Sequence, residues 1–353
     1  MKILYSFNKR GFEADYWTTE ISGASGNRFE FIPFNHDPYV DVSRYVRAQL
    51  LDNLYFDRDP GLMRMYHDLQ DLIATTGAEA LIVDNCNPYH PDWLLKQRIY
   101  KVLRTSDGPL VSYDRDFPYL HAFDHVLYHS PAYSRDFDMA EKLAQMGVRR
   151  ADFWPLALFD RNFDATKDEE TLFNQPRDID VVFIGALFVN KMPLIAKIRK
   201  TFGRRARIHG LTNWKKNLYF NAKYGLPGWI TPISFEEYVP LYQRARIGVN
   251  IHNRGDYTVG SFRLFDLPGN GVMQISDGGA YLKRFFEPGL EIVSYDDSDD
   301  LVQKIRYYLD HESERKAIAL AGHRRVMNDH RFAKRMAQAG EMIAIGIKNK
   351  HAE

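Results

Sequence analysis

Short apolar runs that alternate with helical patterns most limit how this chain can fold. Ala80–Val83 and Val181–Ala186 are compact apolar runs of the kind found in buried parallel strands. Apolar residues recur at helical spacing over 41–56 and 62–75. Because strand and helix patterns alternate along both halves, we predict an α/β fold with two Rossmann-like, doubly wound parallel sheets.

The same reading places the remaining elements. Further strands are predicted over 2–7, 29–34, 110–113, 126–128, 247–251, 272–275 and 291–293. Further helices are predicted over 92–104, 192–202, 235–244, 298–310, 311–328 and 332–347. Residues 212–232 mix aromatic and basic side chains, which can stack bases and hold phosphates. We interpret them instead as an irregular surface segment packed by its aromatic residues.

Length and a change in composition divide the chain into domains. A chain of 353 residues fits about two domains. Residues 161–178 are highly charged and lack a sustained apolar period, so we predict a linker there. This leaves an N-terminal domain over 1–160 and a second domain over 179–331. The terminal helix has one apolar face, formed by Phe332, Met336, Ala339, Ile343 and Ile347.

Composition narrows the classes of function. The formal net charge of +1 gives no global basic field, so nucleic acid is not indicated, although a local basic patch stays possible. A single cysteine, Cys86, excludes an internal disulfide and suits a reducing compartment. No apolar run reaches the roughly 18 residues of a membrane span, and no signal peptide is evident. We therefore expect a cytoplasmic protein, with peripheral membrane contact left open.

Residues 261–277, SFRLFDLPGNGVMQISD, combine a helical turn, a glycine break and a buried strand. Arg263 and Asp266 are three positions apart and share a helix face. Arginine suits phosphate groups, and an acidic residue at such a junction suits ribose hydroxyls. The plain alternative is an exposed ion pair along the helix.

Polar loops after the predicted strands of the first half are candidate cleft residues, because ligands of such sheets bind beyond the strand C-termini. One loop holds Asp84, Asn85, Asn87, Tyr89 and His90. Since Pro91 suits the first position of a helix, His90 is at least as easily explained as a residue at a helix start. The histidines are scattered and no metal-binding motif is present, so no metal site is predicted.

The second half resembles the C-terminal domain of the CgeB-like glycosyltransferases, within the two-Rossmann superfamily called GT-B. The resemblance is carried, in order, by VVFIGALFVNK (181–191), RIHG (207–210), YQRARIGVNIH (242–252), SFRLFDLPGNGVMQISD (261–277), FFEPGLEIVSYDDSDDLVQKIRYYL (285–309) and AGHRRVMNDHRFAKRM (321–336). The first half is similar to that family more loosely. The resemblance implies two domains facing a central cleft, with the helix in 332–353 packing back on the acceptor-side domain.

The resemblance also implies a nucleotide-sugar donor bound to the second domain. Arg263 would face the donor diphosphate, and Asp266, where the family usually has glutamate, would hold the ribose. Gly185, Asn190 and Lys191 would lie near the diphosphate, while His209 and Gly210 would lie by the base. The implied donor-binding set is Gly185, Asn190, Lys191, His209, Gly210, His252, Arg263, Phe265, Asp266 and Gly271, with Gly269–Gly271 packing against the donor.

Glycosyl transfer sets its own chemical demands. The leaving diphosphate needs positive charge, which Arg263, Lys191 and helix N-termini could supply without a metal or any other cofactor. An inverting enzyme also needs a base near the acceptor hydroxyl. Candidate bases in the first domain are Asp114, ranked first for its place at a strand end, then Asp116, His90, Glu13 and Asp15. Each could instead cap a helix or form a surface salt bridge.

The acceptor stays open: a glycan, a protein, a small molecule or a modified DNA base would each fit. Two other functions also stay open. The chain could be an inactive glycosyltransferase-like protein that binds nucleotides or serves a structural purpose, which the glutamate-to-aspartate departure at Asp266 would suit. It could also be a sugar-nucleotide epimerase with the same double fold.

Overall fold

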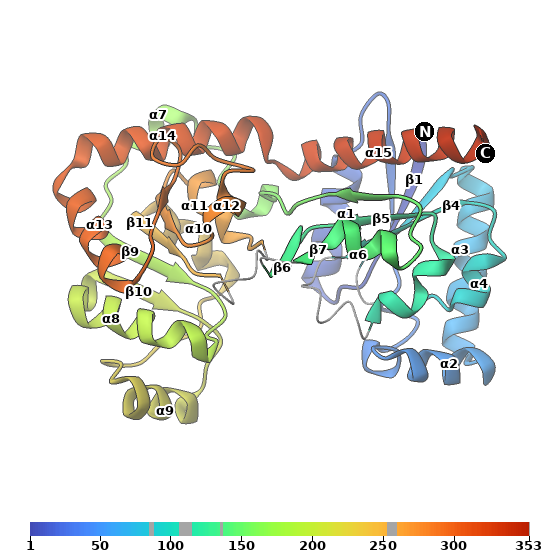
Figure 1. Ribbon diagram of the computed structural model, residues 1–353, viewed down its shortest axis with the longest axis horizontal. Helices are drawn as coiled ribbons and strands as arrows, with labels where there is room; N and C mark the ends of the chain where they lie inside the picture. Colours follow the sequence, from blue (N-terminus) through green and yellow to red (C-terminus); the bar gives the residue numbers. More distant parts are fainter. Residues whose placement is uncertain (85–87, 106–114, 135–136, 253–259, 353) are drawn as a thin grey trace. The chain divides into compact units, whose positions relative to one another are not determined.

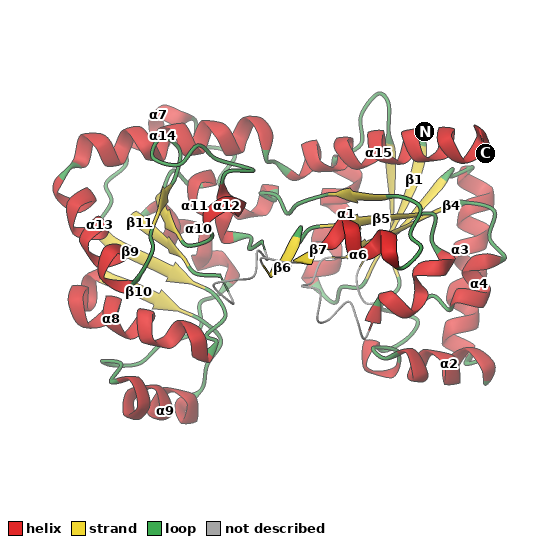
Figure 2. Ribbon diagram, viewed as in Figure 1, coloured by secondary structure: helices red, strands yellow, loops and turns green. Residues whose placement is uncertain are grey.

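The computed structural model describes all residues except 85–87, 106–114, 135–136, 253–259 and 353. The chain forms two compact units. Unit 1 comprises Met1–Leu156 and Phe332–Glu353, and unit 2 comprises Ala157–Arg331. Figure 2 shows the strands of each unit in yellow with helices in red beside them.

Unit 1 contains a six-stranded parallel sheet in the order β2-β1-β3-β4-β5-β8. Its strands are β1 (Lys2–Phe7), β2 (Glu30–Asn35), β3 (Ala80–Asp84), β4 (Tyr100–Thr105), β5 (His125–Tyr128) and β8 (Ala151–Phe153), and β6 (Ala132–Ser134) pairs with β7 (Phe137–Asp138). Its helices are α1 (Phe12–Gly23), α2 (Ala48–Phe56), α3 (Pro60–Thr76), α4 (Pro91–Leu95), α6 (Met139–Gln145) and α15 (Phe332–Ala352), with short 3-10 helices η1 (Val42–Arg44) and η2 (Phe117–Ala122).

Unit 2 contains a five-stranded parallel sheet in the order β10-β9-β11-β12-β13. Its strands are β9 (Ile179–Ile184), β10 (Ala206–His209), β11 (Ala245–Asn250), β12 (Met273–Ser276) and β13 (Val293–Ser294). Its helices are α7 (Glu169–Asn174), α8 (Met192–Phe202), α9 (Trp214–Tyr224), α10 (Phe235–Gln243), α11 (Arg263–Gly269), α12 (Gly279–Leu282), α13 (Ser298–Asp310) and α14 (Glu312–Asp329), with η3 (Asp160–Asn162), η4 (Val189–Lys191) and η5 (Gly203–Arg205).

Both faces of each sheet are covered, which explains why the strands read as continuous apolar runs. In β9, Val181 and Phe183 pack with α8 and α13, while Val182 and Ile184 pack on the other face with α10 and α11. The predicted α/β fold with two doubly wound parallel sheets is thereby confirmed.

The helix α15 belongs to unit 1 although the whole of unit 2 precedes it in the sequence. Figure 1 shows α15, in red, running beside α1. Phe332 packs edge-on against Trp17, with ring centroids 6.1 Å apart, and the indole nitrogen of Trp154 donates to the Arg335 carbonyl at 2.6 Å. The last helix therefore completes the core of the first unit.

Several element predictions differ from the structure. The helix predicted over 92–104 is instead the short α4 followed by strand β4. The strand was missed because it contains two charged residues, Lys101 and Arg104, which are unusual in a buried strand. Both are buried, and they pair with Asp124 and Asp84. Residues 212–232, predicted to be irregular, contain α9. The strand predicted over 110–113 lies entirely outside the described residues.

The predicted linker over 161–178 folds as part of unit 2. It contains α7, whose Leu172 is buried, and its Asn162 is buried as well. The Arg177 guanidinium donates to the carbonyls of Ala245 and Asn270 at 2.7 and 3.2 Å. A few anchored residues thus hold a segment whose overall composition resembles a linker.

A buried ion pair joins the central strands of unit 1. Arg104 of β4 contacts both carboxylate oxygens of Asp84 in β3, at 2.7 and 2.6 Å, and the Tyr5 hydroxyl of β1 donates to the same carboxylate at 3.0 Å. The guanidinium also lies 4.9 Å from the ring centroid of Trp154. Burial raises the pKa of Tyr5 well above its usual value, so the hydroxyl stays a donor. Asp84, a candidate cleft residue by sequence, therefore holds strands together.

Removing one partner of this pair should destabilise the protein strongly. We expect Asp84→Ala to lower the free energy of unfolding by about 3–5 kcal/mol, because it leaves the Arg104 charge buried and unpaired. The double variant Asp84→Leu/Arg104→Leu should lose less free energy of unfolding than the combined losses of Asp84→Leu and Arg104→Leu. Urea unfolding measures both. Glu169→Ala, which breaks the exposed Glu169–Arg324 pair, is the control and should change stability by less than about 1 kcal/mol. An equally small loss for Asp84→Ala would contradict the assignment.

Candidate functional site

The C-terminal edge of the unit 2 sheet contains the point where the strand order reverses. The chain runs from β9 to its neighbour β10 on one side, then crosses to β11 on the other side of β9. The loops after β9 and β11 therefore diverge, which opens a crevice of the kind that binds ligands in doubly wound sheets. Gly185, His209 and His252 are at or directly after the ends of these strands.

Arg263, the first residue of α11, bridges this reversal point. Its Nη1 donates to the Ile184 carbonyl at the end of β9 (3.0 Å), and its Nη2 donates to the Ile251 carbonyl just after β11 (2.9 Å). Its Nε donates to Asn250 Oδ1 at 3.2 Å. The guanidinium carbon also lies 4.9 Å from the ring centroid of Phe183. Four contacts thus fix the position of the positive charge.

Gly185 is required for this arrangement. A Cβ atom at this position would lie 1.9 Å from Nη1 of Arg263. Gly210, at the end of β10, is similarly confined, because its Cβ atom would lie 2.4 Å from the Gly185 carbonyl oxygen. The two glycines therefore let the strand ends and the guanidinium approach each other closely.

Lys191 supplies a second cation near the first. It ends η4, in the loop between β9 and α8, and only 1% of its surface is exposed. Burial lowers the pKa of its amine to about 7, with Arg263 lowering it further and Asp277 acting in the opposite direction. Among the described residues, neither Lys191 nor Arg263 forms an ion pair with a carboxylate. Two close cations without such a partner make a site that an anion would stabilise.

His252 and Asp277 follow the adjacent strands β11 and β12. The Asp277 carboxylate accepts from the His252 backbone N–H at 3.0 Å and also contacts Nδ1 of the ring. That contact leaves Nε2 of His252 buried, without a hydrogen-bond partner among the described residues. Asp277 therefore orients the imidazole, and Nε2 stays available to a ligand.

Other polar residues also lie at this edge of the sheet. Asn190 is exposed within η4, next to Lys191. Burial lowers the pKa of His209, whose Nδ1 is buried without a hydrogen-bond partner in the part of the chain that the structure describes. The Asn250 amide, which holds the Nε of Arg263, also accepts from the Ser261 hydroxyl at 3.0 Å. The structure therefore gathers Gly185, Asn190, Lys191, His209, Gly210, His252 and Arg263 at one edge.

Phe265 and Asp266 turn away from that edge, contrary to the prediction. Phe265 is fully buried, with its ring centroid 5.5 Å from that of Phe285 and 5.3 Å from that of His330, so it has no surface to offer a donor. Asp266 is also buried, and its two oxygens accept from Asn162 and Tyr238. Burial raises the pKa of Asp266 to about 7. The same helix that presents Arg263 thus uses Asp266 as an internal anchor, and no ion pair forms between the two residues.

Gly271 lies at the opposite end of β12, before the strand begins. Its φ of +67° suits glycine, and a Cβ atom there would meet Arg177 at 2.8 Å and Leu172 at 3.1 Å. Gly269 packs against Leu158. Because loops that precede a strand lie at the edge away from its C-terminus, the structure places Gly269–Gly271 away from the crevice at the strand ends.

Of the three highest-ranked candidate bases in unit 1, two have structural contacts and one is not described. Asp114 lies outside the described residues. The carboxylate of Asp116 is fully buried and receives two hydrogen bonds from Arg115 at 2.8 Å. His90 caps α4, since its Nδ1 accepts from the Asp92 backbone N–H at 3.2 Å. Its Nε2 lies 3.0 Å from Asp52, so both ring nitrogens are engaged, as the helix-start alternative anticipated.

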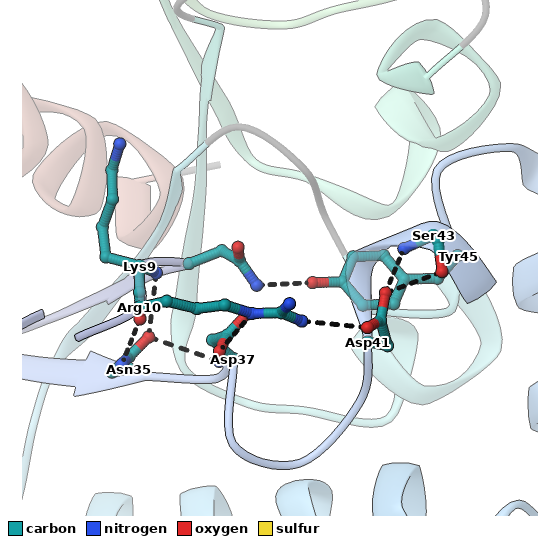
Figure 3. Close-up of polar contacts among 8 residues, drawn as sticks. Lys9, Arg10, Asn35, Asp37, Asp41, Ser43 and Tyr45 are labelled. Carbon is teal, nitrogen blue, oxygen red and sulfur yellow. Dashed lines mark hydrogen bonds and ion pairs between the residues drawn. The ribbon is translucent and has the colours of Figure 1, made fainter. Parts of the chain in front are cut away.

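A polar network occupies the loops after β1 and β2 in unit 1 (Figure 3). Arg10 donates to Asp37 at 2.8 and 2.9 Å and to Asp41 at 3.0 Å. The side-chain amide nitrogen of Asn35 donates to the Lys9 backbone carbonyl at 2.8 Å. The two nearby candidate bases differ: Glu13 pairs with Lys9 at 3.4 Å, whereas Asp15 lies exposed on α1. Arg10 is thus neutralised by carboxylates, unlike Lys191 and Arg263.

Sequence reasoning missed Asn250 and Asp277 as members of the site. Each occupies or directly follows the last position of a buried strand, which is the signal that identified the other residues. Among the described residues, no group of histidine, cysteine, aspartate and glutamate side chains is placed to hold a metal ion. No helix within the described ranges has the length and apolar character to cross a bilayer.

Comparison with known proteins places this geometry in context. Residues 191–341 match a family described as glycosyl transferase-like. A comparison with curated protein sequences gives no match.

Solved structures share the fold over nearly the whole chain. A sucrose-phosphate synthase from Thermosynechococcus elongatus is 14% identical, with 99% of each chain covered and a TM-score of 0.60. HepE from Anabaena, in complex with UDP and glucose, is 11% identical, with 98% of this chain and 99% of HepE covered and a TM-score of 0.59. A glycosyltransferase from Rickettsia africae is 12% identical, with 99% of each chain covered and a TM-score of 0.57. The chain therefore has the GT-B glycosyltransferase fold, and residues 191–341 match the glycosyl transferase-like family.

Proposed function

We propose that this protein transfers a sugar from a nucleotide-diphosphate sugar to an acceptor hydroxyl. The observation that carries the proposal is the pair of neighbouring cations at the reversal point of the unit 2 sheet, the buried Lys191 and the partly buried Arg263. A diphosphate would supply the negative charge that these cations lack among the described residues. The glycosyl transferase-like match over 191–341 and the shared fold support transfer over the alternatives of a non-catalytic protein or an epimerase.

The chemistry follows from where the charges lie. In the transfer, the bond between the anomeric carbon and the diphosphate oxygen breaks, and the diphosphate keeps the electron pair. A new bond forms to the acceptor oxygen, whose proton passes to a base. Lys191 and Arg263 would stabilise the departing diphosphate, so a metal ion is not required for that charge. Asp114 stays our first candidate for the base.

The donor is proposed to carry uridine diphosphate as its leaving group. HepE, which shares the fold, has been solved with UDP-glucose bound, which makes UDP-glucose the first ligand to test. We propose that the nucleotide base of the donor, uracil, lies beside His209 and Gly210 at the end of β10. Asn190 and Lys191 would lie beside the phosphates, together with the oriented imidazole of His252. The proposal fails if no nucleotide sugar in a broad panel raises the melting temperature of the protein.

Replacing Arg263 should weaken donor binding without unfolding the protein. We expect Arg263→Ala to raise the Kd for UDP-glucose by about 10–100-fold, since charged hydrogen bonds to the diphosphate are lost. Arg263→Lys should recover little, because an ammonium cannot reach both strand-end carbonyls at once. Isothermal titration calorimetry measures the affinity, and melting without ligand checks the fold. Arg306→Ala, at an exposed position of α13, is the matched control. Unchanged affinity in Arg263→Ala would refute the assignment.

Donor binding should weaken as the pH rises. The amine of Lys191 has a pKa of about 7 in the free protein, so it is charged below that pH and neutral above it. A bound diphosphate favours the charged form, and binding above about pH 7 must therefore take up a proton. We expect affinity to fall between about pH 6.5 and about pH 8.5. Calorimetry in buffers of different ionisation enthalpy measures the proton uptake, which Lys191→Met should abolish. Equal uptake in that variant would contradict the prediction.

A methyl group at Gly185 should displace the guanidinium of Arg263. The Cβ atom would lie 1.9 Å from Nη1, so Gly185→Ala must push the arginine from its strand-end carbonyls. We expect a loss of UDP-glucose affinity of at least about tenfold, comparable with that of Arg263→Ala. Gly26→Ala, where a Cβ atom meets nothing within 4 Å, is the control. If the double variant Gly185→Ala/Arg263→Ala binds far more weakly than either single variant, the two residues act independently and this explanation is wrong.

A further inference from the structure

The helix α9 packs on unit 2 through Phe220 and Asn217, yet it leaves several other apolar residues exposed. Asn217 is buried, with its side chain donating to the Ile230 carbonyl at 3.0 Å and accepting from the Ile230 N–H at 2.9 Å. Trp214 and Leu218, four positions apart, are 57% and 52% exposed. Figure 1 shows α9 at the rim of unit 2, next to α8. An amphipathic helix that only had to pack on this unit would not need a large tryptophan and a leucine on its exposed side.

The exposed residues of α9 form two adjacent rows. Trp214 and Leu218 lie in one row, and Lys215, Tyr219 and Lys223 follow each other at four-residue steps in the next. We call these five residues the α9 face. Leu211, just before the helix, is 82% exposed. Single exposed apolar residues are ordinary, but a group of them on one helix face marks an interaction surface.

The charge around the α9 face is strongly positive. Residues 181–235 contain ten lysines and arginines and no aspartate or glutamate, in a chain whose net charge is only +1. Lys197 and Arg205 pair with Asp299 and Asp180, which lie outside that stretch. Among the described residues, the lysines at 215, 216 and 223 form no ion pair. Apolar side chains therefore project from a surface with a local positive field.

We propose that the α9 face binds the surface of an anionic lipid bilayer. Tryptophan and tyrosine favour the level of the lipid headgroups, and leucine gains free energy by entering the acyl boundary. Lysines beside them attract anionic headgroups while their stems cover apolar surface. The amine of Lys215 lies 5.5 Å from the Trp214 ring centroid, and that of Lys223 lies 5.2 Å from the Tyr219 centroid. Since lysines partly cover these rings, base stacking in nucleic acid is a poorer match.

Vesicle co-sedimentation tests this proposal with the full chain. We expect binding to vesicles of about one third phosphatidylglycerol in phosphatidylcholine, weak binding to phosphatidylcholine alone, and a loss of binding as salt is raised. The variant Lys215→Gln/Lys216→Gln/Lys223→Gln should bind about 100-fold more weakly, since each lysine near a charged membrane contributes about fivefold. Trp214→Ser/Leu218→Ser should also lose binding, by at least about tenfold.

Matched variants and a competing polyanion make the result decisive. Leu290→Ser is the apolar control, because Leu290 is 58% exposed in unit 2 between Glu287 and Glu291. It should bind vesicles as the unaltered protein does. Absence of vesicle binding in the unaltered protein would overturn the proposal, and so would lysine and Trp214/Leu218 variants that bind equally well. Tight binding to single-stranded oligouridylate with none to vesicles would assign the face to nucleic acid instead. Salt dependence of the unaltered protein tests the proposal even if a variant fails to fold.

Discussion

The candidate site depends on one side chain that holds two strand ends together. The Arg263 guanidinium donates to the carbonyls of Ile184 and Ile251, which lie where strands β9 and β11 end, on either side of the reversal point. The arginine gives both strand-end carbonyls a hydrogen-bond donor. Its charge is thereby held in place before any ligand arrives, so a diphosphate need not order it. Lysine lacks the planar fork that this bridge needs.

The helix that carries Arg263 is fixed from its other end. Asp266 binds Asn162 and Tyr238, and the Asn270 amide donates to the Asn162 carbonyl at 2.7 Å. A buried carboxylate with two neutral donors is costly unless it is partly protonated, which agrees with a pKa raised to about 7. The first residue of α11 thus contacts the strand ends, while the middle of the helix is anchored in the interior, which adds to the contacts that fix Arg263.

The sequence predicted the layout of the fold well, because buried parallel strands leave uninterrupted apolar runs. It failed at β4, where Lys101 and Arg104 are neutralised by partners distant in sequence. It also failed at α9, whose exposed side mixes aromatic, apolar and basic residues. For the site, the pattern of residues 261–277 pointed to Arg263, and the family resemblance added Gly185, Lys191, His209 and His252. Nearness to Arg263 misled for Phe265, which points into the core, and for Asp266, whose carboxylate is held by Asn162 and Tyr238.

The place of α15 has a consequence for biosynthesis. Unit 2 is one continuous segment, Ala157–Arg331, whereas unit 1 needs Phe332 onward to cover Trp17 and Trp154. A ribosome releases the N-terminal segment first, yet that segment has an uncovered apolar face until translation ends. The later-made unit can finish folding before the earlier one. Nascent chains stalled before the last helix would therefore present this face to chaperones.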